Sequence, residues 1–412
     1  MKYGLIGEKL GHSFSKAVHG LLADYEYELK GIPRGEFCEF MTKRDFLAIN
    51  VTIPYKEAVI PYLHFIDENA RDIGAVNTIV NKAGLLYGYN TDFYGMQSLL
   101  NHAKIDLKGK KVAILGTGGT SKTANAVSKS LFAREIITVS RNRRPGVIDY
   151  EELYEKHTDT EVIINTTPLG MYPDIYSKAV ELKYFPNLCG VIDAVYNPLR
   201  TPLIMEGRKR GISAEGGLYM LVAQAVRASE IFTDISYEKT KLEWVYQKIK
   251  TEKENIVLIG MPASGKSTVG RLVAEKSGRK FIDTDDLIVD REGISIPEIF
   301  ESMGEDKFRE IETEIVREVS KDTGVVIATG GGVPLKSQNI DALLENGRIY
   351  FIDRPLDKLL PTDDRPLAST KDAIIKRYNE RYEIYKASSD VQIDAGFDAE
   401  TVTNMILEDF VK

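Results

Sequence analysis

The stretch NIVLIGMPASGKSTVG, Asn255 to Gly270, decides how the second part of this chain folds. An apolar run leads into a glycine-rich turn, G-x4-G-K-S, and then into a segment with helical spacing. Glycines let backbone N–H groups surround phosphate oxygens, and the start of a helix adds a favourable dipole. Lys266 would neutralise the outer phosphates, and Ser267 would bind Mg²⁺. The pattern predicts a P-loop, with a purely structural glycine turn as the alternative.

More than half of the 412 residues precede this stretch, so two or three domains are expected. The chain is 43% hydrophobic and 28% charged, typical of a globular protein, and its net charge of −7 gives no reason to expect nucleic-acid or membrane partners. Cys38 and Cys189 are too few for a disulfide framework or a metal cluster. No apolar run approaches the roughly 20 residues that cross a bilayer. We therefore expect a soluble cytoplasmic protein.

The organisation of the chain follows from two joints. The charged segment YQKIKTEKEN, Tyr246 to Asn255, reads as a linker, and KVAILGTGGTSKT begins another strand–turn–helix unit at Lys111. The fold class is therefore α/β throughout. We expect an α/β substrate domain over 1–102, a Rossmann-type dinucleotide domain with closing C-terminal helices over 103–250, and a P-loop domain resembling nucleoside-monophosphate kinases over 255–412.

Carboxylates follow the strand after the P-loop. FIDTDDLI places Asp283 and Asp285 at the end of that strand, where carboxylates hold Mg²⁺ through water or accept a proton. The simpler alternative is that Asp285 or Asp286 caps the following helix. Arg309 and Glu312, in GEDKFREIETEI, lie one helical turn apart and by themselves form an ordinary salt-bridged face.

Glycines and arginines complete this set. Gly330 to Gly332 follow the strand VVIAT and permit close approach of the backbone to a ligand. Arg365, in a polar loop, and Arg381, in YNERYEIY, suit carboxylates and phosphates, because a guanidinium makes two parallel hydrogen bonds.

Together these motifs resemble shikimate kinase from about Asn255 to Asp394: the P-loop, DTD, FRxIE, GGG, RPL and ERxxIY occur in family order. The resemblance implies transfer of the γ-phosphate of ATP to the 3-hydroxyl of shikimate. Asp285 would bind and activate that hydroxyl, with Lys266 and Arg365 also catalytic, and Mg²⁺ would be held by Ser267 and, through water, Asp283. The segment LDKLLPTDDRPL is short and lacks an additional arginine that many relatives carry. The implied ATP-binding residues are Gly260, Ala263, Ser264, Gly265, Lys266, Ser267 and Thr268, and the implied shikimate-binding residues are Asp285, Arg309, Gly331, Gly332 and Arg381.

The dinucleotide signal lies in GTGGTS, Gly116 to Ser121, where a serine replaces the third glycine of G-x-G-x-x-G. A tight turn that binds nothing is therefore an alternative. An NAD-binding domain usually offers an acid to the ribose about 20 residues on, but here the strand IITVS leads into RNRR, with Arg141, Arg143 and Arg144 clustered. Arginine attracts a 2′-phosphate, so NADP(H) is favoured over NAD(H), with a solvated basic turn as the alternative.

The first hundred residues offer polar groups in loops. Ser13 and Ser15 alternate in LGHSFSKAVHG and could bind one carboxylate together, unless they are helix N-caps. NVTIPYKE delivers Lys56 into a loop, GAVNTIV contributes Asn77, and GYNTDFYG contributes Asp92. An amine beside a carboxylate fits proton transfer coupled to hydride transfer, and a surface salt bridge is the alternative.

Residues 3 to 235 resemble shikimate dehydrogenase, through HSxS, NVTIPYKE, GAVNT, NTD, GTGGTS, NTTPLGM, DAVYNP and GGLYMLVAQA in order. Lys16 stands where relatives usually have proline. The resemblance implies reversible reduction of 3-dehydroshikimate by NADPH, with Lys56 and Asp92 as the catalytic pair. The implied substrate-binding residues are Ser13, Ser15, Thr52, Asn77, Asp92, Tyr196 and Gln224, and the implied NADP-binding residues are Gly116, Gly118, Gly119, Thr120, Ser140, Arg141 and Gly217.

The sequence thus predicts a bifunctional enzyme of aromatic amino acid biosynthesis that makes shikimate and then phosphorylates it. Two other hypotheses stay open. The P-loop part could sense nucleotides without transferring phosphate, although Asp285, Arg309 and Arg381 would then serve no acceptor. The front part could be an NAD-linked catabolic oxidase of quinate or shikimate, although the Arg141 region argues against it.

Overall fold

The computed structural model describes residues 1–10, 14–359 and 370–411, and the chain divides into two compact units, Met1–Ile249 and Lys250–Lys412. The clusters of buried apolar side chains each contain residues of one unit alone. Within the described ranges, no helix combines the length and the apolar character needed to cross a membrane.

The first sheet of Met1–Ile249 is mixed and has the order β2-β1-β3-β5-β6-β4. β5 is antiparallel to both β3 and β6. The strands β3 and β6 therefore run in the same direction and end at the same edge of the sheet. The loop after β3 carries Lys56, and the residues after β6 lead into Asp92, so the topology brings both to one edge. The strands are β1 (Tyr3–Gly7), β2 (Tyr27–Gly31), β3 (Ala48–Val51), β4 (Phe65–Ile66), β5 (Thr78–Lys82) and β6 (Leu85–Tyr89), and the helices are α1 (Ser15–Gly20), α2 (Arg34–Lys43) and α3 (Glu68–Ile73).

The second sheet of this unit is fully parallel, in the order β11-β10-β9-β7-β8. The chain leaves β7 to one side for β8 and returns to the other side for β9, so the strand order reverses at β7. Ligands of open α/β sheets bind at the carboxyl ends of strands at such a switch point. The strands are β7 (Lys111–Leu115), β8 (Glu135–Val139), β9 (Val162–Asn165), β10 (Gly190–Asp193) and β11 (Ser213–Glu215), and the flanking helices are α5 (Gly119–Ser130), α6 (Tyr150–Lys156) and α7 (Pro202–Lys209).

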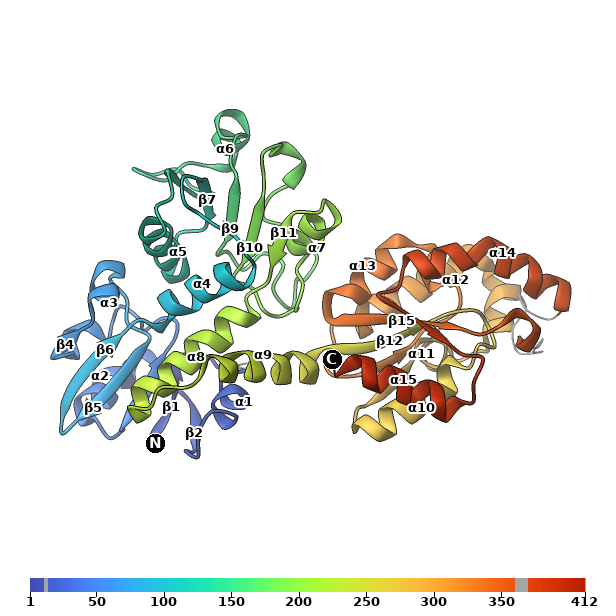
Figure 1. The fold of residues 1–412 in the computed structure, drawn as a ribbon, viewed down its shortest axis with the longest axis horizontal. Helices are drawn as coiled ribbons and strands as arrows, with labels where there is room; N and C mark the ends of the chain where they lie inside the picture. The colour runs from blue at the N-terminus through green and yellow to red at the C-terminus, as the bar shows by residue number, and fades with distance from the viewer. Residues whose placement is uncertain (11–13, 360–369, 412) are drawn as a thin grey trace. The chain divides into compact units, whose positions relative to one another are not determined.

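Two helices pack tightly against each other between these sheets, α4 (Thr91–His102) and α8 (Leu218–Thr233) (Figure 1). Gly95 permits the approach, because a Cβ there would lie 2.8 Å from the Met220 carbonyl oxygen and 3.1 Å from the Gln224 Cβ. The close contact brings the start of α4, where Asp92 lies, near Gln224 on α8.

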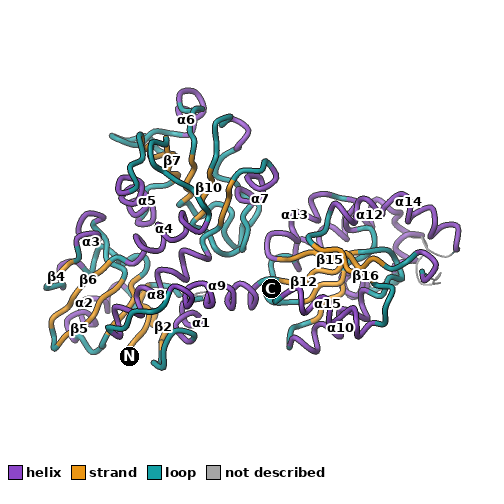
Figure 2. Tube along the Cα trace, in the orientation of Figure 1, coloured by secondary structure: helices purple, strands orange, loops and turns teal. Residues whose placement is uncertain are grey.

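The unit Lys250–Lys412 contains a parallel sheet with the order β13-β14-β12-β15-β16. Alternate residues of the central strand face opposite sides: Val257 and Ile259 pack with α12 and α13, whereas Ile256 and Leu258 pack with α10 and α15. Figure 2 shows helices on both sides of these strands. The elements are β12 (Asn255–Ile259), β13 (Phe281–Asp283), β14 (Val326–Ala328), β15 (Gly347–Asp353), β16 (Val391–Asp394), α10 (Lys266–Ser277), α11 (Thr284–Glu292), α12 (Ile296–Val319), α13 (Ser337–Asn346), α14 (Lys371–Ala387) and α15 (Ala399–Phe410).

The predicted α/β class, with a Rossmann-type sheet and a P-loop sheet, is confirmed. The segment Tyr246 to Asn255, interpreted from the sequence as a charged linker, is mostly helical. The helix α9 (Lys239–Lys253) continues through it and ends just before β12. Glu254 is buried, and its carbonyl accepts a hydrogen bond of 2.6 Å from Arg279. The sequence around Glu254 could not predict this contact, because Arg279 lies 25 residues further along the chain. The domain bounds 1–102, 103–250 and 255–412 stay a prediction.

Candidate active sites

Lys56 and Asp92 form an ion pair at the edge shared by β3 and β6. The Lys56 Nζ lies 2.5 Å from Asp92 Oδ2, and the two side chains are 21% and 13% exposed. Asn90 caps α4 by accepting a hydrogen bond from the Phe93 backbone, which fixes the turn that carries Asp92. The pair is too well covered to be an ordinary surface salt bridge, and an ammonium group held by a carboxylate can deliver a proton.

Asn77 and Gln224 meet at Thr91, beside Asp92. Asn77 Oδ1 accepts a hydrogen bond of 2.8 Å from the Thr91 backbone N–H. The Thr91 hydroxyl lies 3.2 Å from Asn77 Oδ1 and 3.3 Å from Gln224 Oε1. The structure thus brings together three residues predicted to contact substrate, Asn77, Asp92 and Gln224. Sequence reasoning missed Thr91, whose only signal is its place between Asn90 and Asp92.

The other predicted substrate residues lie on neighbouring segments. Ser15 is the first residue of α1 and is 7% exposed, and Phe14 before it packs on Tyr196, with ring centroids 5.3 Å apart. Thr52 follows β3, and its backbone N–H donates to the Ile6 carbonyl at 2.9 Å. Ser13 lies outside the described residues.

The glycine turn after β7 borders Lys56. Gly116 has φ +108°, and a Cβ there would lie 2.7 Å from Thr166 Oγ1, so glycine is required. A Cβ on Gly118 would meet nothing within 4 Å, and one on Gly119 would lie 4.0 Å from the Lys56 side chain. The turn therefore leaves room for a ligand beside the Lys56–Asp92 pair, and the N–H groups that begin α5 suit a pyrophosphate.

Ser121 explains the departure from the glycine pattern. Its hydroxyl donates to the Gly116 carbonyl at 2.7 Å, and the side chain is 2% exposed, so the serine closes the turn from within. Thr120 lies in the first turn of α5. Gly217 has a packing reason of its own, because a Cβ there would lie 2.2 Å from the Ala194 carbonyl oxygen.

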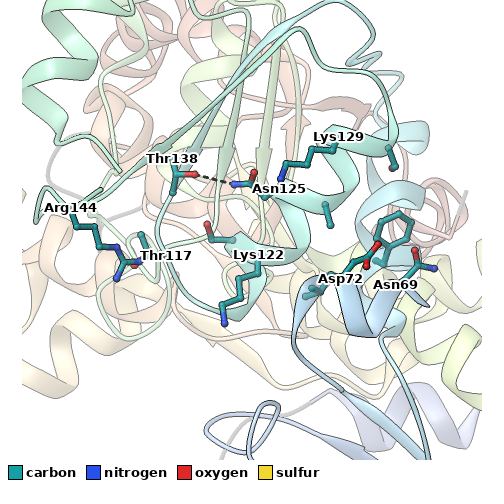
Figure 3. Close-up of a pocket in the computed structure, with 13 residues that line it drawn as sticks. Asn69, Asp72, Thr117, Lys122, Asn125, Lys129, Thr138 and Arg144 are labelled. Carbon is teal, nitrogen blue, oxygen red and sulfur yellow. Dashed lines mark hydrogen bonds between the residues drawn. The ribbon is translucent and has the colours of Figure 1, made fainter. Parts of the chain in front are cut away.

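The basic turn after β8 places its arginines in different surroundings. Arg143 is engaged with Asp149 at 3.1 Å and Glu152 at 2.8 Å. Arg144 lines a cleft of about 800 Å³ together with residues of the glycine turn, α5 and β8, and in Figure 3 it lies beside Thr117. Arg141 is exposed, and Ser140 donates its backbone N–H to the Ile148 carbonyl at 2.9 Å. Two acids on and before α6 therefore hold Arg143, which leaves Arg141 and Arg144 as the arginines of this turn that could meet a 2′-phosphate.

In the second unit, the P-loop has the backbone that phosphate binding needs. Gly260, Ala263 and Gly265 have φ of +151°, +63° and +91°. Lys266 is 5% exposed, and its Nζ donates to the carbonyls of Gly260 at 3.0 Å and Met261 at 2.8 Å. The other predicted ATP-binding residues continue the loop into α10: Ser264 is buried, and Ser267 and Thr268 lie in the first turn.

Ser267 and Asp283 form the pair expected of a Mg²⁺ site. The Ser267 hydroxyl donates to Asp283 Oδ2 at 2.6 Å, and Asp283 Oδ1 accepts the Asp285 backbone N–H at 3.0 Å. Asp283 is therefore the N-cap of α11, and Asp285 and Asp286, the caps that the alternative named, lie in the first turn instead. The role of Asp283 toward Mg²⁺ stays a prediction. Hydroxyl and carboxylate oxygens are donors that Mg²⁺ prefers, usually with several waters retained. In the described ranges, no group of three or more His, Cys, Asp or Glu side chains could hold a metal ion by itself. A Mg²⁺ ion that also binds substrate phosphates and water does not need such a group.

The three glycines after β14 lie against the other predicted site residues. A Cβ on Gly330 would lie 2.5 Å from Asp285 Oδ1 and 3.0 Å from Glu312 Oε1. One on Gly331 would meet the Pro262 ring at 2.9 Å, and one on Gly332 would overlap the Arg309 guanidinium. Only glycine fits at each position, because the neighbouring charged groups and the P-loop occupy the space.

Arg309 is held by a buried carboxylate. Its Nη1 donates to both Glu312 oxygens at 2.9 Å, and the two side chains are 11% and 1% exposed. Glu305 adds a contact of 3.2 Å. Burial raises the pKa of Glu312, against the opposing charge of Arg309. The sequence predicted Glu312 only as a salt-bridge partner of Arg309, and the structure shows that pair. It also places Glu312 against Gly330, next to Asp285, which the sequence did not indicate.

Arg381 faces the glycine segment from α14. It is 8% exposed and donates to the Gly331 carbonyl at 3.2 Å, and the Tyr385 hydroxyl donates to the same oxygen at 2.6 Å. The structure thus gathers Asp285, Arg309 and Arg381 around Gly330–Gly332. Arg365 lies outside the described residues.

Comparison with known proteins agrees with both arrangements. Residues 5–79 match the shikimate dehydrogenase substrate binding domain, and residues 262–411 match shikimate kinase. Shikimate dehydrogenase (NADP(+)) of Clostridium perfringens is 38% identical over 272 residues, covering 60% of this chain and 98% of the relative.

Solved structures resemble the first unit as well. A shikimate dehydrogenase from Peptoclostridium difficile is 35% identical with a TM-score of 0.55, covering 60% of this chain and 98% of that one. A shikimate 5-dehydrogenase from Thermus thermophilus in complex with NADP(H) and shikimate is 25% identical with a TM-score of 0.55, covering 60% and 99%. This chain therefore belongs to the shikimate dehydrogenase family, and its second unit carries a shikimate kinase domain.

Proposed function

We propose that the first unit reduces 3-dehydroshikimate to shikimate with NADPH, and that the second phosphorylates shikimate at its 3-hydroxyl with MgATP. The observation that carries the proposal is the part-buried Lys56–Asp92 pair beside an open glycine turn. We place substrate binding in residues 1–102, the dinucleotide in 103–250 and phosphoryl transfer in 255–412, in a cytoplasmic enzyme.

The residues of the first site account for the reduction. NADPH, when bound, supplies the hydride to the carbonyl carbon. As negative charge develops on the carbonyl oxygen, the Lys56 ammonium stabilises it and gives up a proton, which produces the hydroxyl. Asp92 holds Lys56 in place through the 2.5 Å contact, and Asn77 and Gln224 orient the ring. In the reverse direction neutral Lys56 takes the proton back.

Arg141 and Arg144 support NADP(H) rather than NAD(H). Arg141 is exposed next to Ser140, and Arg144 lines the cleft that includes Thr117 and Ser121. Neither residue has an acidic partner in the described residues, whereas Arg143 has two. Free guanidinium groups at the end of β8 favour a ligand with a 2′-phosphate. The Thermus thermophilus relative, solved with NADP(H) and shikimate, supports the same assignment.

The second site has the parts that phosphoryl transfer needs. The P-loop and Lys266 would hold the phosphates of ATP, and Ser267 with Asp283 would hold Mg²⁺, which neutralises charge on them. Asp285 would accept the proton of the attacking hydroxyl. Arg309 and Arg381 would bind the carboxylate of shikimate, and the glycines after β14 would let the ring lie close to the backbone.

One coupled assay tests both steps. The full chain is incubated with 3-dehydroshikimate, NADPH and MgATP, and the products are identified by mass spectrometry. We expect shikimate 3-phosphate with one NADP⁺ and one ADP formed per molecule. Accumulation of shikimate without ADP would favour a nucleotide-sensing second unit. A higher kcat/KM with NAD than with NADP would contradict the cofactor assignment.

A further inference from the structure

A buried polar network lies behind the predicted substrate residues of the first unit. His19 on α1 has no exposed surface, and its Nδ1 lies 2.6 Å from the Tyr25 hydroxyl. Tyr25 donates to Ser229 Oγ on α8 at 2.9 Å, and the Tyr237 hydroxyl lies 2.9 Å from the same atom. The network joins α1 to α8 through side chains that are more than 200 residues apart in sequence.

The hydrogen-bond directions determine the tautomer of His19. Tyr25 has one hydroxyl hydrogen and gives it to Ser229, so its oxygen accepts from the Nδ1–H of the imidazole. Burial lowers the pKa of His19 to about 3, and the nearby Asn50 side chain raises it by a smaller amount. Within the described residues, the Nε2 atom of His19 forms no hydrogen bond. The ring is neutral near pH 7, so it can hold a position but is not suited to exchanging protons there.

A second series of contacts connects the His19 ring with Asn77. His19 stacks on Tyr27, with centroids 3.9 Å apart and planes 7° apart, and the Tyr27 hydroxyl donates to Asn50 Oδ1 at 2.7 Å. Asn50 Nδ2 in turn donates to Thr78 Oγ1 at 3.0 Å. Thr78 Oγ1 lies 3.0 Å from Asn77 Oδ1, the oxygen that also binds Thr91.

His19 and Ser15 lie on the same short helix, α1. The two residues are four apart on α1, so they share one face of the helix, and both are buried. The helix is six residues long, which is under two turns. A side chain that anchors its end therefore fixes its start, where Ser15 lies.

We propose that His19 is a positioning residue of the dehydrogenase site, which fixes Ser15 through α1 and Asn77 through Tyr27 and Asn50. The proposal rests on the proposed function of the first unit. Within the described residues, the printed ring contacts of His19 are with Tyr25, Tyr27 and Phe232 and none is with the glycine turn. Its replacement should therefore weaken binding of the ring acid and spare binding of the dinucleotide.

The test is a split between two KM values. His19→Phe keeps a planar ring for stacking on Tyr27 but cannot donate from Nδ1. We expect the KM for 3-dehydroshikimate to rise about 3- to 10-fold, as for loss of one buried hydrogen bond. The KM for NADPH should change by less than about twofold, which is within the scatter of effects outside a contact network.

Two further variants separate positioning from general destabilisation. His19→Asn places an amide N–H where Nδ1–H was and should restore part of the lost affinity, whereas His19→Gln, whose amide reaches toward the Nε2 position, should not. Tyr25→Phe removes the same bond from the other side and should reproduce the KM increase. His157→Phe, at the end of α6 and outside the network, is the matched control and should leave both KM values unchanged.

The outcomes distinguish this role from the underlying function. An unaltered KM for 3-dehydroshikimate in His19→Phe and Tyr25→Phe, or an equal rise in both KM values, overturns the positioning role. If His19→Phe does not fold, Tyr25→Phe decides alone. Failure of the unaltered protein to reduce 3-dehydroshikimate would instead contradict the proposed function.

Discussion

Gly118 in the first site and the glycines after β14 in the second leave space for different occupants. In the first unit, a Cβ on Gly118 would meet nothing within 4 Å, so the space beside it is free for a ligand. In the second, Cβ atoms on Gly330 and Gly332 would collide with Asp285, Glu312 and Arg309. Gly118 thus leaves room for a small molecule, whereas Gly330 and Gly332 leave room for the protein's own charged groups.

The charged pairs differ in the same sense. Lys56 and Asp92 are 21% and 13% exposed, whereas Arg309 and Glu312 are 11% and 1% exposed. A buried pair that loses one partner leaves a charge without compensation, which is more damaging than the loss of an exposed pair. The second site should therefore tolerate less change around its charges than the first.

The largest effect should come from removing the lysine of each site. Lys56→Ala should lower kcat for 3-dehydroshikimate reduction roughly 100- to 10,000-fold, because the proton donor is lost, while shikimate phosphorylation stays near normal. Lys266→Ala should have the converse effect, because the phosphates lose their cation. Both rates are measured on each variant, and loss of both activities from either change would contradict independent sites.

Smaller effects should follow from filling the two kinds of glycine. Gly332→Ala forces Arg309 away from its place, and we expect the KM for shikimate to rise about 10-fold or more, as for a disturbed buried charge pair, with the KM for ATP less affected. Gly118 has φ −79°, and a Cβ there would meet open space. Gly118→Ala should therefore leave stability unchanged and raise only the KM for NADPH. Equal losses of thermal stability in the two variants would refute the contrast.

Glu345 tests burial in the second unit by pH. Its side chain is 3% exposed, and burial raises its pKa to about 8 from 4.5. The unfolded chain releases the proton more readily, so this group lowers stability as the pH rises from about 4.5 to 8. Glu345→Gln should increase the free energy of unfolding at pH 8 by about 2–4 kcal/mol, and this gain should vanish near pH 4. Urea titrations that follow kinase activity across this range measure it, and a pH-independent difference would show that Glu345 is not buried as a neutral acid.

The smallest effect should come from the basic turn of the first unit. Arg144→Gln should raise the KM for NADPH about 3- to 10-fold, since an accessible charge on a phosphate is lost, and should change the KM for NADH less. Arg143→Gln is the matched control, because Asp149 and Glu152 already engage that guanidinium. If Arg143→Gln had the larger effect, its ion pairs would have to open when NADPH binds.

The sequence by itself determined the α/β class, the P-loop and the dinucleotide turn, because short patterns of glycine, apolar and charged residues specify local structure. It also named candidate site residues, whose roles stay predictions. The strand order was not readable in this way. It brings Lys56 to Asp92 across 36 residues, and it sets Gly330 against Asp285 and Glu312.

Only the tertiary structure decided which alternatives hold at particular residues. Ser121 closes the dinucleotide turn from inside, Arg143 is taken by two acids, and His19 is a buried neutral ring behind the site. Each of these outcomes depends on a partner supplied by another element. A residue's own pattern gives its chemistry, but its neighbours in space determine its burial, its pKa and its availability to a ligand.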